Sequence, residues 1–246
     1  MEPHSSIYQS TMEIIVIAKQ VKMADSVKCD FAGVEAAIRL KRKTDARIKV
    51  VVMGEEKDAI AQVRDSISMG ADSGTVLLLE NAEIDSWICA KAFSDYLKNE
   101  NFDLLLSGSF PIDADTIQTG LLAGNMLGLA SASHIEDIDT GEASGLLKAK
   151  KRMEDRVQIL DVKMPCMFAA LPHPEAPIYK TVPGINRAYS VDIPVIKLDL
   201  NDQKGKIKVM DSFKIGERKR GKCLTAISTE GAAKEIINTI AANHIL

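Results

Sequence analysis

The polar side chains that could carry chemistry gather behind one apolar run near the middle of the chain. Residues 104–106 are leucines, which suit a strand buried on both faces, and Gly108 ends the run. The following residues read as the start of a helix and supply hydroxyl, amide and carboxylate groups: Ser109, Asp113, Asp115, Thr116, Gln118 and Thr119. Open α/β sheets place ligands at the carboxyl ends of their strands, and the free N–H groups of a helix N-terminus attract phosphate. The sequence therefore indicates a phosphate seat.

The same pattern also fits an ordinary helix start, in which Asp115 is the N-cap and nothing binds. The carboxylates of Asp113 and Asp115 would repel a phosphate unless backbone amides or a sugar hydroxyl hold their oxygens. The local pattern leaves both interpretations open, the ligand seat and the plain helix cap.

Other kinds of site are not indicated. The four histidines are scattered along the chain, which argues against a metal cluster or a Ser-His-Asp arrangement. The four cysteines lie far apart without Cys-x-x-Cys spacing, so we expect no zinc site, no disulfide framework and a reducing, cytoplasmic location. A Gly-x-Gly-x-x-Gly fingerprint, a Walker loop and a nucleophile elbow are all missing from the sequence. We therefore expect neither a metal nor independent catalysis.

The composition is that of a globular chain that can build a sizeable core. Of the 246 residues, 46% are hydrophobic and 26% are charged, and the net charge is −3. This charge supplies no basic field for nucleic acid. No apolar stretch approaches the length of a membrane helix, so we expect no membrane insertion.

Strand and helix patterns alternate in the first half of the chain. Apolar runs at residues 13–20, 48–53, 75–79 and 102–108 alternate with helical periodicity at residues 31–44, 58–69, 86–97 and after residue 115. Successive strand–helix units predict a parallel, doubly wound sheet with right-handed crossovers. Further on, short runs at residues 131–138, 146–150, 157–163 and 166–171 predict antiparallel strands that extend this sheet.

The remaining segments predict a loop, an arm and a tail. Residues 171–184 hold four prolines, so we expect a stiff exposed loop and no helix there. Helical spacing returns at residues 230–243, at the end of a long arm that packs on another subunit or back on its own domain. We therefore divide the chain into a disordered extension at residues 1–11, an α/β domain at 12–198 and a C-terminal arm at 199–246.

Several separated motifs together resemble one known family. They are Ala18-Lys19-Gln20-Val21, Val34-Glu35-Ala36-Ala37-Ile38-Arg39-Leu40-Lys41, Met69-Gly70-Ala71-Asp72, Asp113-Ala114-Asp115-Thr116-Ile117-Gln118-Thr119-Gly120 and Lys163-Met164-Pro165. From about residue 12 to its end the chain resembles the beta subunit of electron-transferring flavoproteins. The resemblance implies an α/β domain of the adenine-nucleotide-binding type that pairs with an alpha subunit. That alpha subunit holds most of a redox-active FAD, which takes electrons from one flavoprotein and passes them to another.

The resemblance also implies where the nucleotide lies. The family's nucleotide loop falls on residues 108–119, with Gln118 and Thr119 at the phosphate and the turn at Met53 and Gly54 beside the adenosine. The cofactor-binding set that we infer is Ile17, Ala18, Met53, Gly54, Gly108, Ser109, Asp113, Asp115, Thr116, Gln118 and Thr119. In the family a segment with an Asn-Pro-Phe sequence closes over the nucleotide. Here residues 22–32 are shorter and lack the asparagine, so the site is expected to hold either AMP or a second FAD, as in the electron-bifurcating branch.

The proline-rich stretch matches the family's recognition loop, at residues 172–187. The resemblance places Val182 at the apolar anchor that inserts into a partner dehydrogenase, of the acyl-CoA type or another flavoprotein, with Tyr179, Pro183 and Ile185 around it. An exposed aliphatic side chain on a stiff loop loses little entropy on docking. The alternative is a loop with purely local packing. For the whole chain, the alternative is a stand-alone adenine-nucleotide-binding sensor of the universal-stress-protein type, although such a sensor does not need the loop and the arm.

Overall fold

The computed structural model describes residues 11–19, 21–23, 26–28, 31–78, 85–108, 116–173, 177–198, 205–206, 210–211, 221, 223, 225 and 228–242. Its strands are β1 (Met12–Lys19), β2 (Val21–Met23), β3 (Ser26–Lys28), β4 (Ala46–Gly54), β5 (Ser73–Leu78), β6 (Leu104–Gly108), β7 (Ala130–Thr140), β8 (Leu146–Arg152), β9 (Val157–Lys163), β10 (Cys166–Ala170) and β11 (Val195–Lys197). Its helices are α1 (Ala32–Lys41), α2 (Glu56–Met69), α3 (Ser86–Leu97), α4 (Thr116–Met126), α5 (Val182–Ser190) and α6 (Thr229–Ala242). The predicted alternation of strands and helices is confirmed.

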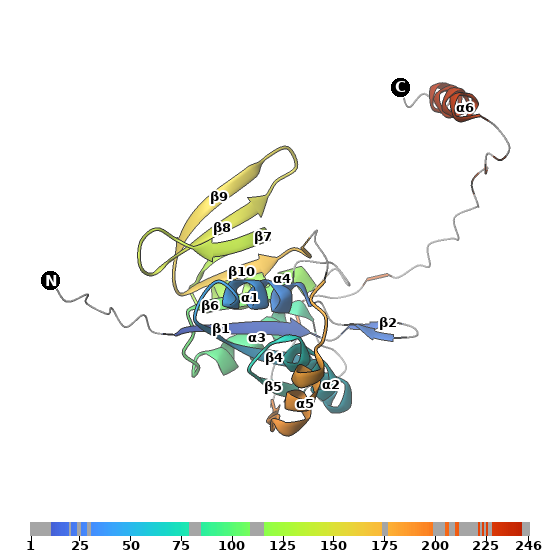
Figure 1. Ribbon diagram of the computed structural model, residues 1–246. Coiled ribbons are helices and arrows are strands. Elements are labelled where there is room, and N and C mark those ends of the chain that lie inside the picture. Colours follow the sequence, from blue (N-terminus) through green and yellow to red (C-terminus); the bar gives the residue numbers. More distant parts are fainter. Residues whose placement is uncertain are drawn as a thin grey trace. The chain divides into compact units, whose positions relative to one another are not determined.

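One sheet carries the fold, and its nine described strands run in the order β11-β5-β4-β1-β6-β10-β7-β8-β9 (Figure 1). Side chains alternate across the sheet, so that Ile14 and Val16 join the apolar cluster under α1 and α2, whereas Ile15 and Ile17 join the cluster under α3 and α4. Helices therefore cover both faces of the central strands. This arrangement confirms the predicted α/β class with a parallel, doubly wound sheet.

The antiparallel extension is confirmed for one part of the predicted region and is wrong for another. β8 pairs antiparallel with β7 and with β9, and these strands rise from the body in Figure 1. β10, however, lies between β6 and β7 and runs parallel to both. All five of its residues are buried, as expected for a central strand covered on both faces.

The predicted absence of helix in residues 171–184 is wrong at its end. α5 begins at Val182, after the N-cap Thr181, whose hydroxyl accepts a hydrogen bond from Gly184 N at 3.1 Å. Pro183 lies in the first turn of this helix, where proline is tolerated because the backbone N–H groups have no intrahelical acceptor there.

Three segments complete the description. A short antiparallel hairpin, β2–β3, follows β1 within the stretch that we expected to be a shortened lid, and β11 adds an edge strand parallel to β5.

The chain divides into two compact units, residues 1–208 and 209–246. Within the second unit, no residue of α6 is buried. Among the residues that the structure describes, no helix is long and apolar enough to cross a membrane.

Candidate functional site

Several of the predicted nucleotide residues lie at one edge of the sheet, where the parallel strands end. Ala18 and Gly54 lie at or next to the carboxyl ends of β1 and β4, and Gly108 ends β6. Parallel pairing of β1 with both neighbours brings these strand ends to the same edge. The side chains of Ile17 and Met53 are buried among the apolar residues beneath that edge, with 3% and 0% exposure. They form the floor of the candidate site.

Two glycines let the helices approach the end of β6 from opposite faces. A Cβ added to Gly33 of α1 would lie 3.0 Å from the carbonyl carbon of Ser107, and one added to Gly120 of α4 would lie under 3.0 Å from Ser107 Oγ. Neither position has room for a side chain. As a result, the N-terminal halves of α1 and α4 both pack against Ser107, which is the geometry that brings helix N–H groups near the end of the strand.

The first turn of α4 carries the polar groups predicted to meet a phosphate. Gln118 is exposed, whereas Thr119 is buried at 3% exposure next to the strand end. The side-chain amide oxygen of Gln118 lies 3.5 Å from the hydroxyl of Ser86, at the start of α3. Thr116 opens α4. The predicted contacts at Ser109, Asp113 and Asp115 lie outside the described residues.

The second candidate region is α5, which has an inverted distribution of large and small side chains. Val182, Ile185 and Tyr189 follow one another at helical spacing and are exposed, at 73%, 39% and 68%. On the opposite side Ala188 is fully buried, and Gly184 leaves no room for a side chain against Ser68. Large apolar side chains normally cover a core, so a helix that turns them to solvent is a candidate docking surface.

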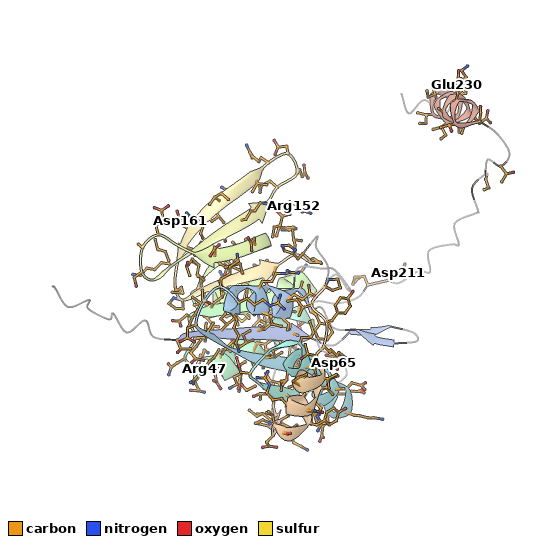
Figure 2. The ribbon with its side chains drawn as sticks, viewed as in Figure 1. Arg47, Asp65, Arg152, Asp161, Asp211 and Glu230 are labelled. Carbon is orange, nitrogen blue, oxygen red and sulfur yellow. The ribbon has the colours of Figure 1, made fainter. Side chains whose placement is uncertain are left out.

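The exposed face of α5 is continued by Tyr179 and is fixed from below by α2. Tyr179 is 73% exposed. Polar contacts attach the segment to α2: Thr181 N donates to the carbonyl oxygen of Ser68 at 3.2 Å, and Lys180 Nζ lies 2.6 Å from Asp65 Oδ1. The position of Asp65 beside α5 is labelled in Figure 2. The guanidinium of Arg64 stacks on the Tyr189 ring, 4.5 Å from its centre.

Arg187 is the central residue of this attachment. Its Nη2 donates to the carbonyl oxygens of Ile67 and Ala71, at the C-terminal end of α2, where a cation also meets the helix dipole favourably. Its Nη1 lies 3.8 Å from Asp72, whose carboxylate also accepts from Lys41 Nζ at 2.5 Å. The exposed face of α5 is therefore held on a rigid part of the domain.

The sequence comparisons agree with this geometry. A family model described as the electron transfer flavoprotein domain matches residues 14–201. The chain belongs to the beta-subunit family of electron transfer flavoproteins. It is 24% identical to an electron transfer flavoprotein subunit beta of Thermoanaerobacterium thermosaccharolyticum, over 96% of this chain and all of that one. It is 25% identical to the corresponding subunit of Bacillus subtilis, over 86% of this chain and 83% of the relative. A caffeyl-CoA reductase–Etf complex subunit, CarD, of Acetobacterium woodii is 24% identical over 96% of this chain and all of that relative.

Membership of this electron transfer flavoprotein family confirms the resemblance that the sequence motifs indicated. The relatives are subunits of electron-transfer proteins, so the chain has the features of a flavoprotein subunit in electron transport, and a beta subunit implies an alpha subunit as its partner. Within the described part of the chain, no group of three or more His, Cys, Asp or Glu side chains could hold a metal ion. Burial raises the pKa of the Cys166 thiol to about 12, so this cysteine is a core residue with no tendency to form a thiolate.

Some residues of the candidate sites were not identified from the sequence. Gly33 and Gly120 were missed because their importance comes from a close approach to Ser107, which no local pattern reveals. Ser86 and Tyr189 were missed for the same reason, since each acts through a neighbour distant in the sequence. For Tyr189, the available signal in the sequence was a helical periodicity that continues through this residue.

Proposed function

We propose that this chain is the beta subunit of a heterodimeric electron-transferring flavoprotein. It helps an alpha subunit to hold FAD, binds an adenine nucleotide at the carboxyl edge of its sheet, and passes electrons between flavoprotein dehydrogenases and an acceptor. The observation that carries the proposal is that one family domain, residues 14–201, contains both the Gln118–Thr119 turn and the exposed face of α5. The redox chemistry belongs to the flavin, and the protein supplies binding, orientation and docking.

The nucleotide at this edge is proposed to be AMP or a second FAD. The narrow approach of α1 and α4 to Ser107 supports a phosphate position, because it brings helix N-termini and the Gln118 amide to one place. The second-FAD form belongs to electron bifurcation, and the relative named as part of a caffeyl-CoA reductase–Etf complex supports a partner that acts on CoA esters. We propose contacts to the nucleotide from the complete set that the resemblance implies, including Ser109, Asp113 and Asp115.

The first experiment is to purify the chain together with its alpha subunit and to measure the FAD and AMP released on denaturation. We expect a yellow heterodimer with one FAD and one AMP, or with two FAD and no AMP. A colourless chain that forms no complex with the alpha subunit would sink the proposal.

The second experiment tests the nucleotide turn. Replacing Gln118 and Thr119 with alanine removes side-chain partners of a charged group, each worth about 1.5–3 kcal/mol, so we expect nucleotide affinity to fall at least tenfold. Asn125→Ala, at another exposed position on α4, is the matched control. Nucleotide retention equal to that of the control would mean that the turn is only a helix cap.

The third experiment tests docking to a dehydrogenase of the acyl-CoA or a related flavoprotein type. Val182→Asp places a charge on the side chain proposed to enter an apolar pocket, so electron transfer should slow strongly while cofactor content stays unchanged. Val157→Asp changes a second exposed valine, on β9, and serves as the control. Equal rates in the two variants would place docking elsewhere.

The arm at residues 199–246 is proposed to wrap the alpha subunit. Its helix α6 carries Ile236 and Ile237 with 53% and 57% exposure, an apolar surface that a partner would cover. A cytoplasmic location stays a prediction, as does the disordered extension at residues 1–11.

A further inference from the structure

Three consecutive residues at the start of α3 connect two distant parts of the first compact unit. Asp85 is the N-cap, and its Oδ1 accepts from Ile88 N at 2.9 Å. Ser86 places its hydroxyl 3.5 Å from the amide oxygen of Gln118 on α4. The Trp87 ring lies beneath Lys206, whose Nζ is 4.4 Å from the ring centre. The start of α3 thus joins the nucleotide turn to a segment far along the chain.

The contact with that distant segment is close and specific. Lys206 N donates to Asp85 Oδ2 at 2.5 Å, so one carboxylate both caps α3 and holds the backbone of residue 206. A Cβ added to Gly205 would lie 2.9 Å from the same oxygen, so a larger residue there would push against the Asp85 carboxylate. We call Asp85, Trp87, Gly205 and Lys206 the Asp85 cluster.

The start of α3 is linked to the nucleotide turn through the orientation of the Gln118 side-chain amide. Ser86 is 1% exposed, and its hydroxyl lies 3.5 Å from the Gln118 amide oxygen, towards which it can donate a long hydrogen bond. With that oxygen engaged, the NH₂ end of the amide is the end that can donate to a ligand, and a phosphate accepts hydrogen bonds only. A shift of the first turn of α3 would move Ser86 and release this orientation.

We propose that Gly205 and Lys206 are positioning residues for the nucleotide turn, and that they couple nucleotide binding to the capture of the partner subunit. The inference rests on the proposed function. Gly205 and Lys206 lie within the proposed arm, residues 199–246, but they belong to the first compact unit, which ends at Lys208. The rest of the arm follows directly after them. When the partner holds the arm, the Asp85 cluster stays closed and Gln118 stays oriented. By linkage, the nucleotide then favours the partner by the same factor.

The test measures nucleotide affinity with and without the partner. AMP and, in parallel, FAD are titrated calorimetrically into the full-length chain and into its heterodimer with the alpha subunit. Gly205→Ala forces a methyl group against Asp85, and Lys206→Met removes the cation over Trp87 but keeps its stem. The matched control is Lys98→Met, because this lysine is 56% exposed at the other end of α3 and lies outside the proposed arm.

In the wild-type protein we expect the heterodimer to bind the nucleotide about 5- to 20-fold more tightly than the chain alone. Both cluster variants should lose most of this difference, whereas Lys98→Met should keep it. Thermal unfolding of the variants is recorded alongside, and if Gly205→Ala does not fold, Lys206→Met carries the test. Cluster variants that retain the full wild-type difference would overturn this inference alone. A wild-type chain and heterodimer that bind neither nucleotide would instead overturn the proposed nucleotide site, and this inference with it.

Discussion

Val182, Ile185 and Tyr189 form the proposed docking face of α5. A substitution of Gly184 would move this face without changing any of its side chains, so it tests whether the position of the face matters. A Cβ at this position would lie well under 3.0 Å from the Ser68 carbonyl oxygen and 2.8 Å from Thr181 Oγ1. Ordinary contacts with carbon begin near 3.5 Å, so Gly184→Ala requires α5 to move from α2 by about 1 Å. The backbone of α2 cannot yield as a flexible side chain would.

The structure sets the size of the effect. Overpacking of this kind costs about 1–3 kcal/mol. The displacement also weakens the hydrogen bonds from Thr181 N to Ser68 and from Arg187 to Ile67 and Ala71, each worth about 0.5–1.5 kcal/mol. A partner must then restore the order of α5 on binding, and a penalty of about 1.4 kcal/mol corresponds to a tenfold weaker complex.

The assay is steady-state electron transfer between the heterodimer and a flavoprotein dehydrogenase, with the heterodimer as the varied substrate. For Gly184→Ala we expect KM to rise about tenfold, with kcat and the FAD content unchanged. Lys98→Met, outside α5 and the arm, is again the control. A wild-type KM in a folded Gly184→Ala protein would refute the view that the contact with α2 positions the docking face. Loss of FAD from that variant would refute the separation of docking from cofactor binding.

The ion pair between Lys49 and Glu100, 2.8 Å apart and with both side chains 28% exposed, should make stability depend on pH. Burial raises the pKa of Glu100, but the hydrogen bonds from Lys49 and Tyr96 outweigh burial, so the net effect lowers this pKa. Burial lowers the pKa of Lys49, but the hydrogen bonds of Lys49 to Glu100 and Tyr96 outweigh burial, so the net effect raises this pKa. The ion pair therefore stabilises the fold at every pH between the unfolded-state pKa of Glu100 and the unfolded-state pKa of Lys49. This stabilisation is lost as the pH falls through the folded pKa of Glu100 or rises through the folded pKa of Lys49. In urea unfolding, Glu100→Gln should cost about 1 kcal/mol at neutral pH, and its difference from wild type should vanish as the pH falls through the folded pKa of Glu100; a constant difference would contradict this reasoning. In thiol labelling with peptide mapping, the isolated chain should react at the exposed Cys223 and at Cys166 only after denaturation, and labelling of native Cys166 would show that its core opens.

The parallel core could be predicted because each strand carries its own burial signal. Residues 104–106 form an uninterrupted apolar run, and all three side chains have 0% exposure. Helices such as α3 also show their apolar period locally. The position of the candidate nucleotide edge follows directly from such a pattern, since parallel strands end at one side of the sheet.

Strand order was less accessible, because an apolar run does not show which strands will flank it. The residues of β10 are buried on both faces in the way that any central strand is, whether parallel or antiparallel. Its place between β6 and β7 depends on pairing Cys166 with Leu104 on one side and with Ala130 on the other. These partners lie far from β10 in the sequence, so the hairpin-like spacing of the preceding strands was a misleading guide.

The inverted face of α5 is a case in which the local pattern and the global packing disagree. The helical period alone would predict that the face with Val182, Ile185 and Tyr189 is buried, because burying large apolar side chains stabilises a fold the most. The fold instead buries Ala188, and it holds the exposed face in place through Arg187. Local preference and global packing usually agree, and a disagreement tends to persist where function needs it. A helix fixed firmly with its apolar face outward therefore supports docking more strongly than a flexible loop with the same residues would.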